Sequence, residues 1–247
     1  MRSTQDKKSV IQEKSPRGTI ITPRSAIQKL SSPLLIPSLL SGDQGDLRSS
    51  QKIIELHQLP WVHMDIMDGH FVSNLSFGAQ TLKALKKGSS LLFDVHLMLE
   101  HPEIFLESFI EAGADLISFH IESQGTSRDM LQYVREENVL VGLACDLGTS
   151  PERLVPWLEQ VDVVLLMAVQ AGFCGQSFNP DVLMKIDRIG KLRRQHKLPF
   201  FIAVDGGINV TTAQDCLQHG ADLLVSGSSF FDPAQREALR KLFPLHV

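Results

Sequence analysis

The chain has 247 residues, of which 43% are hydrophobic and 21% are charged, a composition typical of a globular protein. No apolar run approaches the roughly 20 residues that a membrane-spanning helix needs, and the net charge of -4 gives no overall basic footprint for nucleic acid. The three cysteines form no CxxC pair, which argues against a zinc knuckle or a disulfide framework and favours a reducing, cytoplasmic location.

Residues 1–32 differ from the rest of the chain in charge. They hold seven Lys or Arg against two acidic residues, a net charge of +5, which leaves -9 for the remainder. The segment is rich in Ser, Thr and Gln and shows no sustained helical or strand period, which predicts a flexible, basic extension. A targeting peptide, a solvated tail and an upstream start codon are alternative interpretations. We expect the folded domain to span residues 33–247.

From Leu34 onward, short apolar runs alternate with longer amphipathic segments. Eight runs have the length and composition of buried strands: residues 34–40, 61–67, 91–99, 115–122, 140–147, 162–169, 200–206 and 222–229. Helical patterns lie between them, and the clearest are residues 102–113, 127–138, 150–160 and 179–196. This succession predicts an α/β fold of the (β/α)8 TIM barrel type. A doubly wound open sheet uses the same alternation and is the architectural alternative.

Three of these strands carry polar side chains that could meet. In the run WVHMDIM at 61–67, His63 and Asp65 share one face because side chains alternate along a strand. His96 and Asp205 also lie in the C-terminal halves of their strands, at what would be the mouth of a barrel. Two imidazoles and two buried carboxylates suit one divalent metal ion such as Zn, Fe, Mn or Co. Taken singly, each residue could instead be a satisfied interior histidine or an ion-paired aspartate.

Six motifs in the chain resemble those of the ribulose-phosphate 3-epimerase family. In chain order they are IPSLLSGD, HMDIMDGHFVSNLSFG, DVHLM, LLMAVQAGFCGQSF, VDGGIN and VSGSSFF, and the resemblance covers about residues 34–231. It implies a barrel enzyme of the pentose phosphate pathway. Such an isomerase interconverts D-ribulose 5-phosphate and D-xylulose 5-phosphate by moving the proton on carbon 3. The resemblance further implies a phosphorylated ketose as substrate. We also expect a homo-oligomer, and the net charge and the lack of long apolar runs predict no nucleic acid or membrane partner.

Particular residues take their expected roles from this resemblance. His63, Asp65, His96 and Asp205 correspond to the ligands of one divalent metal, and Asp65 and Asp205 to acid/base groups on opposite faces of a planar ene-diolate. The corresponding substrate contacts are Ser38, Met67, His96, Met98, Met167 and Asp205. His120 and Glu122 fit the fourth strand of the family and receive no role.

Three glycine-bearing turns follow the last three strand candidates. Turns at this end of a barrel commonly bind phosphate, since glycine lets backbone N–H groups approach an anion closely. The residues expected to bind phosphate are Gly172, Phe173, Cys174, Gly175, Gly206, Gly207, Gly227 and Ser228.

The chain departs from the family pattern in two loops. Where the family commonly reads MSVNPGFGGQ, this chain reads MAVQAGFCGQ, with Ala171 in place of proline and Cys174 in place of glycine; Ser73 also stands where a proline is usual. Two other functions fit the same motifs. One is an epimerase of allulose 6-phosphate, and the other is a phosphosugar-binding barrel without catalysis, against which the two intact aspartates count.

Overall fold

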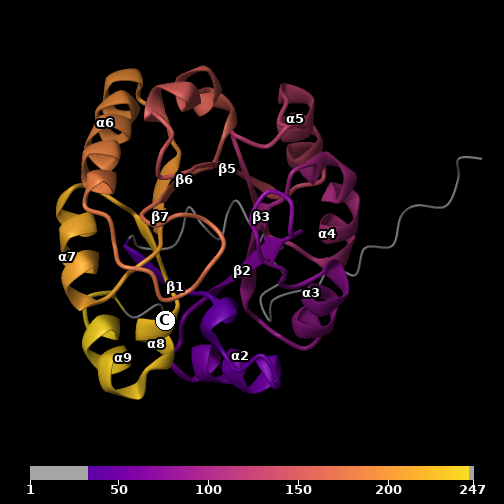
Figure 1. The fold of residues 1–247 in the computed structure, drawn as a ribbon, viewed down its shortest axis with the longest axis vertical. Coiled ribbons are helices and arrows are strands. Elements are labelled where there is room, and N and C mark those ends of the chain that lie inside the picture. The colour runs from indigo at the N-terminus through magenta and orange to yellow at the C-terminus, as the bar shows by residue number, and fades with distance from the viewer. Residues whose placement is uncertain (1–32, 245–247) are drawn as a thin grey trace, which may run out of the picture.

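In the computed structural model, which describes residues 33–244, eight parallel strands surround a common axis and helices surround the strands (Figure 1). The strands are β1 (Leu34–Pro37), β2 (Trp61–Met67), β3 (Leu92–Met98), β4 (Leu116–His120), β5 (Leu140–Cys145), β6 (Val163–Met167), β7 (Phe201–Asp205) and β8 (Leu223–Ser226). All eight fall inside their predicted ranges. The predicted basic extension, residues 1–32, lies outside the described residues.

The strand ladder closes on itself. Strands pair in the order β1-β8-β7-β6-β5-β4-β3-β2, which leaves β1 and β2 at the two ends of the ladder. A parallel bridge between Ser38 and His63 joins these ends. The (β/α)8 barrel is therefore confirmed, and the open-sheet alternative is wrong.

Helices follow the strands and pack on the outside of the barrel. The α-helices are α2 (Leu47–Leu56), α3 (Ala79–Lys86), α4 (Leu106–Ala112), α5 (Arg128–Glu136), α6 (Asp181–His196), α7 (Val210–Gln218), α8 (Ser228–Phe231) and α9 (Pro233–Arg240). Three segments wind as 3-10 helices, η1 (Leu39–Ser41), η2 (Pro102–Ile104) and η3 (Pro151–Gln160). No helix within residues 33–244 is both long and apolar enough to cross a membrane.

Two of the predicted helices differ from the regular α-helices expected. The segment at 102–113 is split into η2 and α4, and the segment at 150–160 is a 3-10 helix with Pro156 inside it. Proline has no N–H to donate, and in an α-helix its ring clashes with the carbonyl four residues back, which disfavours α-helical winding there.

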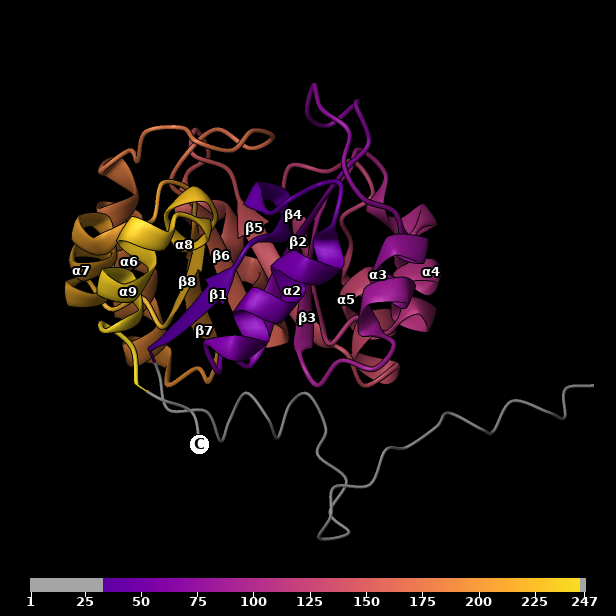
Figure 2. The same ribbon diagram turned by 90° about the horizontal axis from the view of Figure 1, so that it is seen from below.

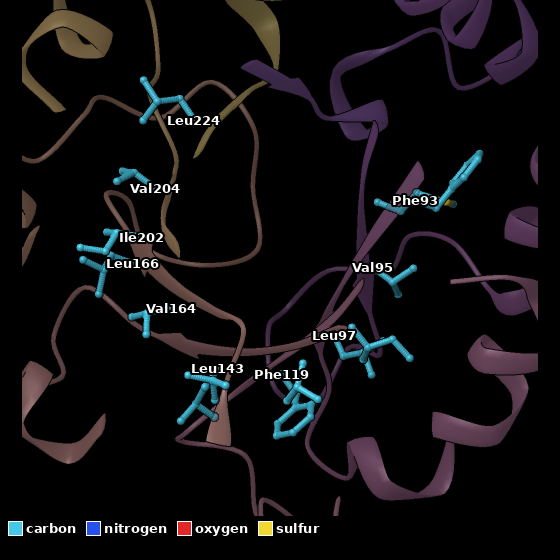
Figure 3. Packing of buried hydrophobic residues seen from close by; sticks show 14 of the residues in the cluster. Phe93, Val95, Leu97, Phe119, Leu143, Val164, Leu166, Ile202, Val204 and Leu224 are labelled. Atoms are coloured by element: carbon cyan, nitrogen blue, oxygen red, sulfur yellow. The ribbon is translucent and has the colours of Figure 1, made fainter. Parts of the chain in front are cut away.

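Side chains alternate between two buried clusters along each strand. The outward residues pack against the helices, as Val62, Met64 and Ile66 of β2 do, and Figure 3 shows further members on β3 to β8. The inward residues form a second cluster inside the barrel that includes Met67 and Met98. Each large apolar side chain buried in this way contributes about 1.5–3 kcal/mol. The few polar side chains on the inward face are therefore exceptions in an apolar interior.

The barrel has two unlike ends. The long loops that follow β2 and β6 rise from the end toward which all strands point (Figure 2). The ends of strands β2, β3, β6 and β7 at Met67, Met98, Met167 and Asp205 lie on this side. The predicted functional residues come from strands β2, β3, β6 and β7 and from the segments that follow β1, β6, β7 and β8.

Candidate metal centre and active site

Four side chains from three strands meet inside the mouth of the barrel. His63 and Asp65 come from β2, His96 from β3 and Asp205 from β7, and each offers a ligand atom within 4.8 Å of the others. The parallel register places Asp65 beside His96 on the neighbouring strand. Both histidines are fully buried, and Asp65 is 5% exposed. The structure thus brings together all four residues predicted to bind a metal.

The spacing of these atoms fits one shared cation. His63 Nε2 lies 3.4 Å from Asp65 Oδ1 and 3.9 Å from Asp205 Oδ2, while His96 Nδ1 lies 3.5 Å and 3.7 Å from the same two oxygens. Neither nitrogen has a hydrogen-bond partner, although both are buried. Two ligands of a tetrahedral zinc ion at roughly 2.1 Å stand about 3.4 Å apart, so the donor set suits a divalent metal.

The remaining polar atoms of the two β2 residues are held by neighbours. His63 Nδ1 lies 2.7 Å from Asp94 Oδ2, which directs Nε2 toward the cluster. The Ser38 hydroxyl donates to Asp65 Oδ2 at 2.5 Å and accepts from the Leu40 N–H at 3.2 Å. Asp65 therefore keeps its Oδ1 for the cluster. Alternation alone places Asp94 on the same face as His96, and its contact with His63 depends on the register between strands, so it received no predicted role.

His96 is held by a pair of residues that received no predicted role either. Its Nε2 lies 2.8 Å from His120 Nε2, and His120 Nδ1 lies 3.2 Å from Glu122 Oε2. His120 is fully buried at the end of β4. Its signal in the sequence was the same as that of His63, a histidine facing inward near the end of an apolar strand.

The two carboxyl groups of the cluster differ in proton affinity. Burial and then the charge of Asp65 raise the pKa of Asp205 to about 7. Burial alone would also raise the pKa of Asp65, but His63 and His96 hold it well below its ordinary value. Burial likewise opposes a charge on His63, yet Asp94 and Asp65 raise the pKa of that imidazole well above its usual range. Two carboxyls separated in this way can serve as a base and an acid at one site.

A pocket opens directly above the cluster. Its lower wall includes Ser38, Asp65 and Asp205 together with the three predicted methionines, Met67, Met98 and Met167. These methionines are at most 5% exposed and belong to the apolar cluster inside the barrel. A wall of this kind excludes water from the carboxylates.

The predicted phosphate-binding turns line the other side of the same pocket. All eight residues, Gly172, Phe173, Cys174, Gly175, Gly206, Gly207, Gly227 and Ser228, contribute to it. Gly207 has a φ of +66°, and a Cβ there would stand 2.7 Å from the backbone nitrogen of Phe178. The serines Ser41, Ser177 and Ser229 also line the pocket and were not predicted.

Hydrogen bonds brace the loop that departs from the family pattern. Asn74 Nδ2 donates to the Gly172 carbonyl at 2.8 Å, and Gln176 Nε2 donates to the carbonyls of Gln170 at 2.6 Å and Phe173 at 3.0 Å. Ala171, which replaces a proline, is buried against the inner cluster. The loop thus has fixed contacts on both sides of the substituted position.

The fold and the site define a protein of the (β/α)8-barrel class with a candidate metal centre and a glycine-lined pocket beside it. Residues 34–231 match the Ribulose-phosphate 3 epimerase family, and the chain belongs to that family. The chain is 41% identical to the ribulose-phosphate 3-epimerase of Treponema pallidum over 84% of its own length and 95% of that protein. It is 36% identical to the enzyme of the same name from Bacillus subtilis over 81% of its own length and 93% of that protein.

Other comparisons extend these likenesses. A chloroplastic ribulose-5-phosphate-3-epimerase of Arabidopsis thaliana is 35% identical, over 86% of this chain and 77% of that protein. Among solved structures, a 3-keto-L-gulonate-6-phosphate decarboxylase of Vibrio cholerae superposes with a TM-score of 0.62 at 12% identity. That superposition covers 87% of this chain and 100% of the other. At this level of identity the structural likeness supports the barrel fold alone.

Proposed function

We propose that this chain interconverts D-ribulose 5-phosphate and D-xylulose 5-phosphate by moving the proton on carbon 3. One observation carries the proposal: Asp65 and Asp205 approach a single cluster of candidate metal ligands from different strands, β2 and β7. Inverting a stereocentre through a planar intermediate requires a proton carrier on each face, and two carboxylates from separate strands can supply one each. The match to the epimerase family over residues 34–231 supports the same reaction.

The mechanism assigns a direction to the two carboxylates. Asp65 takes the proton from carbon 3 of ribulose 5-phosphate, and the electrons of the broken C–H bond form an ene-diolate with the adjacent carbonyl group. Asp205 delivers a proton to carbon 3 from the opposite face, and the two residues exchange roles in the reverse reaction. His63, Asp65, His96 and Asp205 would hold the metal. When bound, a divalent cation supplies positive charge that stabilises the ene-diolate oxygens.

Other residues orient Asp65, shield the two carboxylates from water and hold the sugar in place. The hydroxyl of Ser38, bonded to Asp65 Oδ2, fixes the orientation of the base. The three methionines form a polarisable, apolar wall that slows loss of the transferred proton to water. Backbone amides of the turns at Gly175, Gly206, Gly207, Gly227 and Ser228 bind the phosphate, and so set the sugar above the carboxylates.

Deuterium exchange in the Asp205→Asn variant tests this mechanism. The amide keeps an oxygen for the metal but cannot carry the proton, so epimerisation should fall by about 10²- to 10⁴-fold. Because Asp65 remains, ribulose 5-phosphate incubated with the metal-loaded variant in D2O should still take up deuterium at carbon 3. Asp65→Asn should abolish that uptake. Full epimerisation by metal-loaded Asp205→Asn would mean that one group serves both faces and would refute the proposal.

Substrate assays separate the two alternatives. Turnover of allulose 6-phosphate in preference to ribulose 5-phosphate would identify a hexulose phosphate epimerase, and binding of both without turnover would identify a non-catalytic barrel. Zn, Fe, Mn and Co remain the predicted metals, and metal analysis of purified protein distinguishes them. A cytoplasmic location and a homo-oligomeric state also stay predictions, which fractionation and sedimentation velocity test.

A further inference from the structure

His96 contacts a buried pair of residues that lies outside the candidate metal ligands. We propose that His120 and Glu122 are positioning residues that keep the proton of His96 on Nε2 and so leave His96 Nδ1 free to bind the metal. The inference rests on the metal site proposed above. It assigns a role to two residues that the epimerase mechanism leaves unused.

The geometry of the two imidazoles suits a strong hydrogen bond. The nitrogen atoms His96 Nε2 and His120 Nε2 are 2.8 Å apart, the ring centroids are 5.0 Å apart and the ring planes differ by 18°. The centroid separation exceeds the nitrogen separation by about the width of one ring, so the rings lie end to end in nearly one plane. An imidazole nitrogen carries its proton or its lone pair in the ring plane, which aligns an N–H with a lone pair here.

Glu122, the outermost of the three residues, determines which nitrogen donates and which accepts in each hydrogen bond. Burial would raise the pKa of Glu122, but its neighbours, which include the side chains of His120 and Thr149 and the N–H of Asp146, together lower it to about 2, so Glu122 is a carboxylate and only accepts. His120 must therefore donate from Nδ1, at 3.2 Å from Glu122 Oε2, and accept at Nε2. His96 then donates from Nε2. A neutral His96 is left with its lone pair on Nδ1, the atom that faces Asp65 and Asp205.

Glu122 is itself held in place by the loop after β5. Its Oε1 accepts from the Asp146 N–H at 3.1 Å, and its carboxylate also bonds the Thr149 side chain. Lys185 Nζ donates to the carbonyls of Asp146, Leu147 and Thr149 at 2.6–2.8 Å and so fixes that turn. Because Glu122 must accept on both oxygens, the direction of every hydrogen bond inward to His96 is set.

The two histidines of the metal set are therefore oriented by different means. His63 donates directly to the Asp94 carboxylate. His96 contacts no carboxylate on that side; His120 lies between it and the carboxylate of Glu122. The centroid of the Phe71 ring lies 4.8 Å from that of His120, so Phe71 packs against this imidazole. Partners of this kind fix the tautomer of metal-binding histidines and tune metal affinity.

The Glu122→Gln variant tests the proposed role of Glu122, because its amide has one acceptor oxygen for two N–H donors, those of His120 and Asp146. When that oxygen accepts from Asp146, the NH2 group faces His120 Nδ1 and reverses each hydrogen bond inward, which puts a proton on His96 Nδ1. We expect Zn2+ affinity, measured by competition with a chromophoric chelator, to fall by about 10- to 100-fold. The visible spectrum of the Co2+-loaded variant should change as well, since a ligand is displaced.

A second pair of variants distinguishes positioning from packing. His120→Gln offers an amide oxygen that can accept from His96, whereas His120→Leu leaves the His96 Nε2 proton buried without an acceptor. Zinc affinity should therefore fall more in His120→Leu than in His120→Gln. Melting temperatures taken with chelator present report any general loss of stability separately from metal affinity.

Glu103→Gln is the matched control. His101 and Glu103 have the same sequence spacing and a similar separation, 3.1 Å, but lie at the surface away from the pocket. Their disruption should leave zinc affinity unchanged. Zinc affinity of Glu122→Gln within about twofold of the wild type, or equal loss in Glu103→Gln, would overturn the inference. A wild-type protein that binds none of the four metals would instead refute the metal site itself.

Discussion

At the scale of single residues, the site is a problem of balancing buried charge. Asp65, Asp94 and Asp205 lie near two imidazoles in an interior from which water is largely excluded. In the metal-free protein, protons offset the negative charge. Asp205 retains a proton up to about pH 7 because burial and Asp65 raise its pKa. His63 retains another because Asp94 and Asp65 raise its pKa. A divalent cation bound at the proposed site would replace these protons.

Metal binding should therefore stabilise the protein more as pH rises from 6.5 to about 8. An unfolded aspartate loses its proton near 3.8 and an unfolded histidine near 6.5, whereas Asp205 and His63 keep theirs in the fold. Because the folded state then binds more protons, the free energy of unfolding of the metal-free protein falls with rising pH in this range. Burial lowers the pKa of His96 and His120, so their opposite contribution is largely complete above 6.5.

Melting curves with and without Zn2+ across this range measure the effect. For a domain of this size, about 1 kcal/mol corresponds to roughly 2–4 °C in Tm. The Tm gained on adding metal should grow with pH, and the growth should shrink in Asp205→Asn. A gain that is constant from pH 6.5 to about 8 would contradict this account of the proton balance.

At the scale of elements, strands supply the side chains proposed to react, and turns supply the residues proposed to bind the phosphate. These strands belong to one continuous ladder that a bridge closes, which suits groups that must keep fixed directions. The turns require backbone conformations that only glycine adopts readily, and Gly206 and Gly207 both have positive φ, at +109° and +66°. The groups proposed for proton transfer and those proposed for phosphate binding thus lie in different kinds of local structure.

Replacing Gly207 by valine should weaken substrate binding more than metal binding. The new Cβ would stand 2.7 Å from the Phe178 backbone nitrogen, so the turn must move away from its position in the pocket. We expect KM for ribulose 5-phosphate to rise at least about 10-fold, equivalent to about 1.4 kcal/mol, with zinc affinity nearly unchanged. Gly88→Val is the control, since Gly88 has a φ of +76°, a Cβ there would meet no atom within 4 Å, and the residue lies outside the pocket. Equal loss of metal and substrate binding would refute the assignment.

The sequence predicted the strands better than it predicted which side chains on different strands contact one another. The strand Trp61–Met67 has its predicted bounds, whereas the strand predicted at 34–40 ends at Pro37, since Ser38 caps a 3-10 turn there. Alternation identified the inward face of each strand and hence the four candidate ligands. Which inward residues touch depends on the register between strands, so the pairing of His63 with Asp94 could not be read from the sequence. The contact of His96 with His120 was hidden for the same reason.

At the scale of the whole molecule, the described chain begins and ends on the side away from the pocket. β1 starts, and the chain leaves α9, at the edge of the barrel opposite the long loops of the site (Figure 2). All the candidate site residues lie between Ser38 and Ser229. The domain predicted at 33–247 therefore contains every group that the proposed reaction requires.

A chain that begins at residue 33 should retain the activity of the full chain. Since β1 starts at the end of the barrel opposite the long loops of the site, kcat/KM and Tm should stay within about twofold and about 2 °C of the full-length values. The comparison uses the same purification and metal loading for both proteins. A large loss of kcat/KM with unchanged metal content would show that residues 1–32 contribute to catalysis and would contradict the predicted domain boundary.

Because the bridge between Ser38 and His63 closes the barrel, the metal content of the protein should indicate whether the barrel is closed. Asp205 on β7 reaches the candidate ligands of β2 and β3 only when the barrel is closed. The closing bridge joins Ser38, which donates to Asp65, to His63, which is itself a candidate ligand. A nascent or damaged chain with that seam open keeps β7 apart from β2 and has no complete cage for the ion. Such a chain lacks the full set of four candidate ligands, so we expect its metal affinity to be lower than that of the closed barrel. Closure of the barrel and completion of the candidate metal site are therefore one and the same structural event.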